Sequence, residues 1–177
     1  PEYRYLMDRR KALNGPLPTM DLGIRNPMEL PLDDAFVEID EGSGDVELST
    51  TGAFTRLLRS LGRDPNVGER IVPIIPDEGR TFGMEPLFKE MGIYASEGQL
   101  YEPVDHNLIL SYRESTDGHI LEQGITEAGS TASWIAAATS YATRGVPMIP
   151  FYSFYSMFGF QRVGAALWGA ADSRARG

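Results

Sequence analysis

The stretch ILEQGITE, residues 120–127, predicts a short apolar strand that turns at Gly124 and delivers Glu127 to the start of a helix. Residues 119–122 are bounded by an Asp-Gly pair and by Gly124, which are typical of turns. Residues 128–141 are rich in alanine and have almost no polar face, so we expect a helix that is buried on most sides. Glu127 then lies in the first turn of this helix.

Two interpretations of Glu127 follow from this pattern. Glutamate is common in the first turn of a helix, where the helix dipole and the free backbone N–H groups stabilise an anion by roughly 0.3–1 kcal/mol. A carboxylate carried into an apolar wall, in contrast, costs free energy unless it meets a partner, and the ring nitrogen of a ligand would be such a partner. The pattern of residues alone leaves both interpretations open.

The composition is that of an ordinary globular domain. The 177 residues are 42% hydrophobic and 23% charged, and a chain of this length buries roughly 70% of its unfolded surface. The net charge of −9 argues against nucleic acid or an anionic membrane as the main partner. No apolar run of about 18 residues and no leader pattern occurs, so we expect neither a membrane span nor a secretory signal.

Metal and thiol chemistry find little support in the sequence. The chain has no cysteine, which is compatible with a cytoplasmic location. Its two histidines, His106 and His119, are too far apart to indicate a metal-binding pair on one helix. We therefore predict no metal ligand in this chain.

The organisation of the chain predicts a linker over residues 1–48 and a domain over residues 49–177. The first 48 residues contain several prolines and acidic runs without a sustained period. Ser49 or Thr50 is a suitable cap for the helix that follows, which ends near Gly62. Its apolar residues have the spacing of a single helix face: Phe54, Leu57, Leu58 and Leu61.

Strands alternate with helices in the second part of the chain, which predicts an α/β fold with a parallel sheet. Residues 71–75 form a short β-branched run and residues 146–151 a later apolar run. Ligands of such sheets bind at the carboxyl ends of the strands. The turns at 77–78, 124–127 and 152–158 lie at that edge, and Tyr155 and Phe158, three residues apart, would share a face if they were helical.

Three separated segments resemble the homodimeric bacterial pyruvate dehydrogenases, the decarboxylating component of the pyruvate dehydrogenase complex. They are PIIPDEGRTFGME (73–85), ILEQGITE (120–127) and MIPFYSFYSMFGFQR (148–162). The resemblance extends from about residue 49 to residue 177. It implies an enzyme that depends on thiamine diphosphate, of which this chain resembles only the middle, pyrimidine-binding domain of the transketolase-like group.

The resemblance also implies roles for particular residues. Glu127 matches the glutamate that hydrogen-bonds a ring nitrogen of the aminopyrimidine, favouring the tautomer that takes a proton from the thiazolium ring. Ile125, Tyr155 and Phe158 match residues that surround the aminopyrimidine. Asp77 and Glu78 match acidic residues that line the active centre.

The chain resembles only part of such an enzyme, so we expect an incomplete site and a domain that is incomplete at its C-terminus. It lacks the motif that holds Mg²⁺ and the diphosphate in the family. The resemblance therefore implies three partners: the diphosphate-binding domain of a second subunit, the dihydrolipoyl acyltransferase component, and pyruvate. The alternatives are another transketolase-like thiamine diphosphate enzyme, or a non-catalytic fragment that only pairs with a partner chain.

Overall fold

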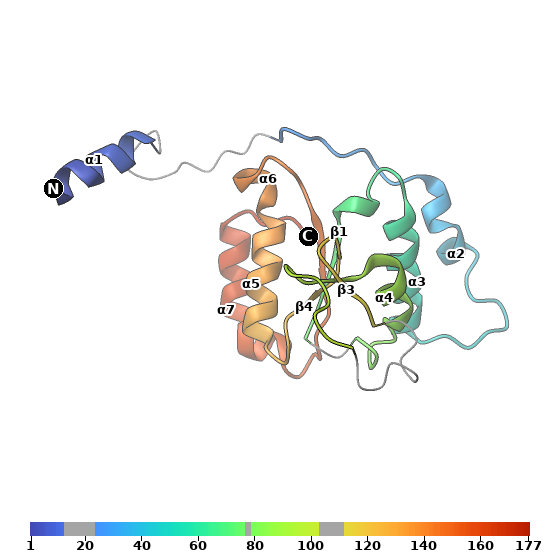
Figure 1. Ribbon diagram of the computed structural model, residues 1–177. Coiled ribbons are helices and arrows are strands. Elements are labelled where there is room, and N and C mark those ends of the chain that lie inside the picture. Colours follow the sequence, from blue (N-terminus) through green and yellow to red (C-terminus); the bar gives the residue numbers. More distant parts are fainter. Residues whose placement is uncertain (13–23, 77–78, 103–111) are drawn as a thin grey trace.

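A parallel sheet forms the centre of the protein, with helices on both faces. The computed structural model describes residues 1–12, 24–76, 79–102 and 112–177. The sheet has the strand order β4-β1-β5, with β1 at Ile71–Ile75, β4 at Leu121–Glu122 and β5 at Ile149–Tyr152. Helices α3 and α4 lie on one side of the sheet, and α5 and α7 on the other (Figure 1). The predicted α/β fold with a parallel sheet is confirmed.

Strand β1 is the centre of the sheet because its side chains are apolar and mostly β-branched. All five of its residues are buried. It pairs with β5 in the register Ile71↔Ile149 and with β4 in the register Ile74↔Leu121. Pro73 has no backbone N–H to donate to a neighbouring strand. The central strand tolerates it because β4 pairs only with the last two residues of β1.

A second pair of parallel strands extends the fold beside β4. Strands β2 (Ile93–Tyr94) and β3 (Glu114–Ser115) pair with each other, and a parallel bridge joins Ile93 to Ile120. The chain between β3 and β4 passes directly against the backbone of β2 at Gly118. A Cβ atom added to Gly118 would lie 2.4 Å from the carbonyl carbon of Ile93, so only glycine allows this close approach.

Helix α3 (Thr50–Arg63) confirms the predicted helix and its cap. The Ser49 hydroxyl accepts a hydrogen bond from the N–H of Gly52 at 3.0 Å. Leu58 and Leu61 are buried, and Phe54 and Leu57 pack against the same core. Helix α4 (Glu85–Met91) adds further core residues, and the short η2 (Gly68–Arg70) leads into β1.

The N-terminal segment begins with a helix, and the two short helices that follow it were not predicted by sequence analysis. Helix α1 (Glu2–Ala12) has no buried residue, whereas η1 (Asp33–Phe36) and α2 (Val37–Asp40) pack beside α3. Ala35 is buried, and the Leu32 N–H donates to Oδ2 of Asp64 at 2.8 Å. Part of the predicted linker therefore contacts the domain, while the boundary at residues 48 and 49 stays a prediction.

The helix after the central stretch differs from the expectation. Helix α5 (Glu127–Ala138) is capped by Thr139, and α6 (Ser140–Thr143) and α7 (Gly159–Asp172) follow later in the chain. The prediction that this helix is buried on most sides was wrong. Ser130, Thr131 and Ala138 are buried, but three alanines spaced four residues apart are exposed: Ala128, Ala132 and Ala136. They share one helix face, which no described segment covers.

Candidate functional site

The predicted site residues follow the carboxyl ends of the central strands. Because β1, β4 and β5 are parallel, the turns after them meet at one edge of the sheet. Glu127 follows β4, and Tyr155 and Phe158 follow β5. Asp77 and Glu78, predicted from the turn after β1, lie outside the residues that the structure describes.

Glu127 is the first residue of α5, where its carboxylate is held in a defined position. Gly124 makes the turn before it with a φ of +71°, and the Thr126 hydroxyl caps the helix by accepting from the N–H of Gly129 at 3.2 Å. Oε1 of Glu127 lies 2.8 Å from Nη1 of Arg162, and the Glu127 side chain is only 13% exposed. The geometry thus holds a largely shielded carboxylate at the sheet edge.

The electrostatics keep the Glu127 carboxylate ionised. A hydrogen bond from its own backbone N–H and then the Arg162 guanidinium lower the pKa of Glu127. Partial burial acts in the opposite direction but is outweighed. The group is therefore a hydrogen-bond acceptor at neutral pH.

Arg162 is the residue that sequence analysis missed. It lies on α7, and its guanidinium carbon is 4.4 Å from the centre of the Phe158 ring. The side chain is 53% exposed. Phe158 and Arg162 are four residues apart at the start of α7, a spacing that suits the ring contact. No local pattern indicates the pairing with Glu127, which is 35 residues away.

Tyr155 and Phe158 come together on the turn that the sequence predicted after the third strand. Residues 153–158 are not helical, so the two rings do not share a helix face. A turn brings the rings together instead, with the Phe158 N–H donating to the Tyr155 carbonyl at 2.8 Å. Their ring centres are 6.3 Å apart at an interplanar angle of 85°, and Phe82 lies 5.0 Å from Tyr155. Tyr155 and Phe158 are edge-to-face, and Phe82 is tilted against Tyr155 at 34°.

The hydroxyl groups of Tyr152, Ser130 and Thr131 lie near the start of α5, where Glu127 is. The Tyr152 hydroxyl donates to the Glu127 carbonyl at 3.4 Å. Burial raises the pKa of Tyr152, and the hydroxyls of Thr131 and Ser130 offset part of this rise. Both of these hydroxyls are buried and have no partner with hydrogen-bond geometry among the described residues. The first two turns of α5 are thus more polar than its alanine content indicates.

Large apolar side chains on the segments around Glu127 are exposed. We call Ile125, Met157, Phe160 and Trp168 the apolar rim; their exposed fractions are 78%, 65%, 66% and 71%. Ile125 therefore does not pack into the core of this chain. Large apolar side chains that stay exposed are suited to contact with a ligand or another protein.

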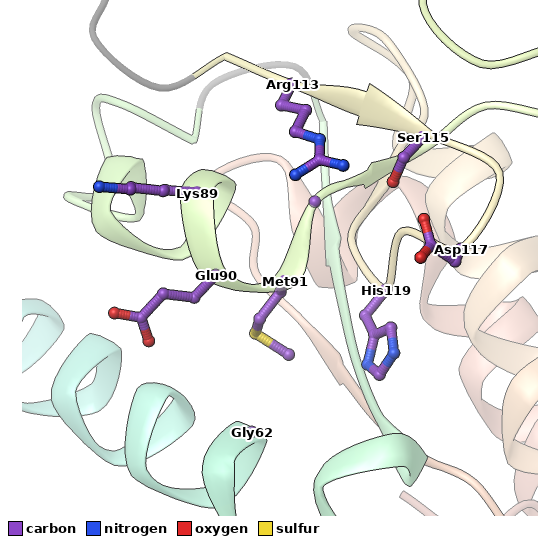
Figure 2. A pocket seen from close by; sticks show the side chains of 9 residues that line it. Gly62, Lys89, Glu90, Met91, Arg113, Ser115, Asp117 and His119 are labelled. Atoms are coloured by element: carbon purple, nitrogen blue, oxygen red, sulfur yellow. The ribbon is translucent and has the colours of Figure 1, made fainter.

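A separate hollow of about 210 Å³ lies at the beginning of β2 and β4, away from Glu127. Figure 2 shows Arg113, Ser115, Asp117 and His119 around it. A hydrogen bond from Ser115 and one from its own backbone N–H, with smaller effects of Arg113 and His119, lower the pKa of Asp117. The hollow lies before β2 and β4, at the opposite end of the strands from Glu127, so it is not part of the candidate site.

The described part of the chain contains no cluster of three or more histidine, aspartate or glutamate side chains suited to a metal ion. Within the same residues, no helix is long and apolar enough to cross a membrane.

Comparisons with known proteins agree with the resemblance in the sequence. The family described as the pyruvate dehydrogenase E1 component middle domain matches residues 28–177. The chain is 54% identical to the pyruvate dehydrogenase E1 component of Pseudomonas aeruginosa, 53% to that of Mycolicibacterium smegmatis and 48% to that of Escherichia coli. Each match covers 99–100% of this chain but only 19–20% of the relative. The chain thus spans about a fifth of the length of these curated relatives.

Proposed function

Because this chain belongs to the pyruvate dehydrogenase E1 middle-domain family, we propose that it forms the half of a thiamine diphosphate site that receives the aminopyrimidine ring. The observation that carries the proposal is the shielded, ionised carboxylate of Glu127 at the carboxyl edge of a parallel sheet. When bound, thiamine diphosphate supplies the carbon nucleophile and the electron sink for decarboxylation of a 2-oxo acid.

Glu127 accepts a hydrogen bond from a ring nitrogen of the aminopyrimidine in this proposal. An ionised carboxylate favours the protonated form of a neighbouring ring nitrogen, and the interaction is stronger where water is excluded. The Thr126 cap fixes the helix start, so the carboxylate does not have to be ordered when the ring arrives. The side chain thus holds a proton at a defined ring atom.

Tyr155, Phe158 and Ile125 form the wall that receives the ring. A flat heterocycle matches an aromatic cluster in both shape and polarity. Tyr155 and Phe158 lie on the turn after β5 at the edge that also carries Glu127, and Ile125 is exposed beside it. Asp77 and Glu78 follow β1 in the sequence, and we propose that they line the same active centre.

The other half of the site belongs to a partner in this proposal. The apolar rim and the exposed alanine face of α5 are suited to cover by the diphosphate-binding domain of a second subunit, which would also hold Mg²⁺. The complete enzyme would decarboxylate pyruvate and transfer the acetyl group to lipoyl on the dihydrolipoyl acyltransferase component. The relatives named pyruvate dehydrogenase E1 component support this assignment.

The proposal is tested by replacing Glu127 with glutamine in the intact protein. We expect thiamine diphosphate to bind, and pyruvate turnover to fall by about a hundredfold or more, the usual scale for an acid–base group. Glu69→Gln is the matched control, because Glu69 is also a glutamate in the first turn of a helix but precedes β1, at the opposite end of the sheet. Turnover within about threefold of the wild type in Glu127→Gln would refute the role of Glu127.

The substrate is tested in the same assay. We expect the wild-type protein to use pyruvate in preference to a branched 2-oxo acid or a sugar phosphate. Preference for either of the latter would identify another enzyme of the thiamine diphosphate group.

A further inference from the structure

Two adjacent hydroxyls inside the first turns of α5 are buried and are not used in the proposed function. Ser130 and Thr131 are 0% and 1% exposed, and neither hydroxyl has a partner with hydrogen-bond geometry among the described residues. Burying a hydroxyl without a partner is unfavourable, and nearly all buried polar groups in folded proteins are hydrogen-bonded to protein or to ordered water. The pair therefore indicates a small ligand at this place.

The two hydroxyls converge on the end of β5, which packs against α5. Both lie close enough to the hydroxyl of Tyr152 to lower its pKa, against the larger rise that burial causes. The Tyr152 hydroxyl also meets the carbonyl of Glu127, but at 3.4 Å, which is longer than the roughly 2.5–3.0 Å of an ordinary O–H···O hydrogen bond. Polar groups at such long distances are often joined through a water. We call the three hydroxyls and this carbonyl the polar site.

We propose that one water molecule is bound in the polar site and links β5 to the start of α5. Buried waters typically form about three hydrogen bonds to groups that lack other partners. This water accepts hydrogen bonds from the hydroxyls of Ser130 and Thr131, and it donates to the hydroxyl oxygen of Tyr152 and to the carbonyl of Glu127. Each of the four groups then has a partner that matches its donor or acceptor character.

The chemistry of the polar site fits a neutral ligand better than a cation. Mg²⁺ and Ca²⁺ take about six or more oxygen ligands, usually with carboxylates among them, whereas the polar site consists of hydroxyls and one carbonyl. The nearby carboxylate of Glu127 is held by Arg162 instead. Burial raises the pKa of Tyr152, so its hydroxyl is neutral near pH 7. A water supplies both donors and acceptors without adding a charge.

The position of the polar site gives the water a role beside Glu127. Tyr152 is the last residue of β5, and Glu127 is the first residue of α5. Holding the carbonyl of Glu127 against β5 fixes the backbone from which its side chain projects. Thr131 is therefore a positioning residue for Glu127, and this step alone rests on the proposed function.

The first test is a crystal structure of the intact protein at a resolution that shows ordered waters. We expect an electron-density peak about 2.6–3.2 Å from Oγ of Ser130 and from Oγ1 of Thr131. The peak should be lost in Thr131→Val, which keeps the shape of the side chain and removes its hydroxyl. Hydroxyls that bond directly to Tyr152 or to helix carbonyls, with no such peak, would overturn the inference.

The second test uses the direction of a change in amide exchange. If Thr131 holds the water, Thr131→Val loses one hydrogen bond, and the amides in the first turns of α5, such as that of Ser130, should exchange about 2- to 12-fold faster. Thr131→Ser keeps a hydroxyl and should stay near the wild-type rate. If the Thr131 hydroxyl has no partner, valine removes an unfavourable group instead. Exchange in Thr131→Val at or below the wild-type rate would therefore contradict the bound water.

Thr55→Val is the matched control. Thr55 is also a buried threonine within a helix, at 5% exposed, but its hydroxyl donates to the carbonyl of Thr51 at 3.0 Å. We expect Thr55→Val to leave both the density peak and the exchange of α5 unchanged. Equal acceleration of α5 exchange in Thr55→Val and Thr131→Val would show that the effect does not arise at the polar site.

The positioning role is tested in the enzyme loaded with thiamine diphosphate. A displacement of about 1 Å can cost about a hundredfold in rate, and for the smaller shift expected in Thr131→Val we predict a kcat about 3- to 10-fold lower. The KM for pyruvate should change less than about twofold, and Thr131→Ser should restore kcat. Unchanged kcat in Thr131→Val would overturn the positioning role. Full activity in Glu127→Gln would overturn the proposed function and leave the water site to the two structural tests.

Discussion

Gly118 is the position where a single methyl group should perturb the sheet most directly. A Cβ at this position would lie 2.4 Å from the Ile93 carbonyl carbon, 2.5 Å from its oxygen and 2.6 Å from the Tyr94 nitrogen. These atoms belong to the backbone of β2, so they cannot rotate away as a side chain can. Overpacking of this kind costs about 1–3 kcal/mol, and we expect Gly118→Ala to cost about 2–3 kcal/mol.

Hydrogen exchange measures this cost at the bonds concerned. The Tyr94 N–H donates to the Ile120 carbonyl at 2.8 Å, and the Ile120 N–H donates to the Gly92 carbonyl at 3.0 Å. If Gly118→Ala destabilises this contact by about 2–3 kcal/mol, both amides should exchange roughly 30- to 150-fold faster. The measurement is made on the intact protein by mass spectrometry of the peptides that contain these residues.

Gly169→Ala is the control for the substitution itself. Gly169 lies inside α7, and an added Cβ would meet no atom within 4 Å. Alanine should stabilise this helix by about 0.5–1 kcal/mol and leave exchange in β2 unchanged. If the amides of Tyr94 and Ile120 exchange in Gly118→Ala at the same rate as in the wild type, the chain does not pass against β2 as described.

Two further predictions concern a helix start and the acid stability of the fold. Thr126→Ala should destabilise the start of α5 by about 0.5–2 kcal/mol, because the N–H of Gly129 loses its acceptor, whereas Thr126→Ser should retain it. Equal amide exchange at the start of α5 in the two variants would contradict the role of the Thr126 hydroxyl. Burial alone would raise the pKa of Asp64, but hydrogen bonds from backbone N–H groups, including that of Leu32, lower it. The ionised group therefore stabilises the fold above its unfolded pKa of about 3.9, and this contribution is lost as the pH falls through the lower folded value. Melting temperatures between pH 2 and pH 6 should fall less steeply in Asp64→Asn than in the wild type, and parallel curves would contradict the assignment.

Local patterns in the sequence were sufficient to predict the central elements of the fold. A strand is indicated by the β-branched residues 71–75, and a helix by the single apolar face of residues 50–63. In both cases the spacing of residues within the segment is sufficient. The alternation of these elements then predicted the parallel sheet. The matching family confirms the resemblance that the three motifs indicated.

Features that depend on distant parts of the chain could not be predicted in this way. The exposure of Ala132 and Ala136 depends on which segments cover α5, and helical periodicity carries no information about that. The partner of Glu127 is Arg162 on another helix, and the close approach at Gly118 depends on the path of β2. The spacing of the aromatic residues in 153–158 suits both a turn and a helix, so it could not specify how the rings of Tyr155 and Phe158 meet.

The most direct test of the central claim follows a proton on the cofactor. In the intact protein loaded with thiamine diphosphate, NMR measures how fast the hydrogen between the nitrogen and sulfur of the thiazolium ring exchanges with solvent deuterium. If Glu127 controls the protonation of the aminopyrimidine, Glu127→Gln should slow this exchange by about a hundredfold or more while cofactor remains bound. Exchange at the wild-type rate in fully loaded Glu127→Gln would contradict the claim.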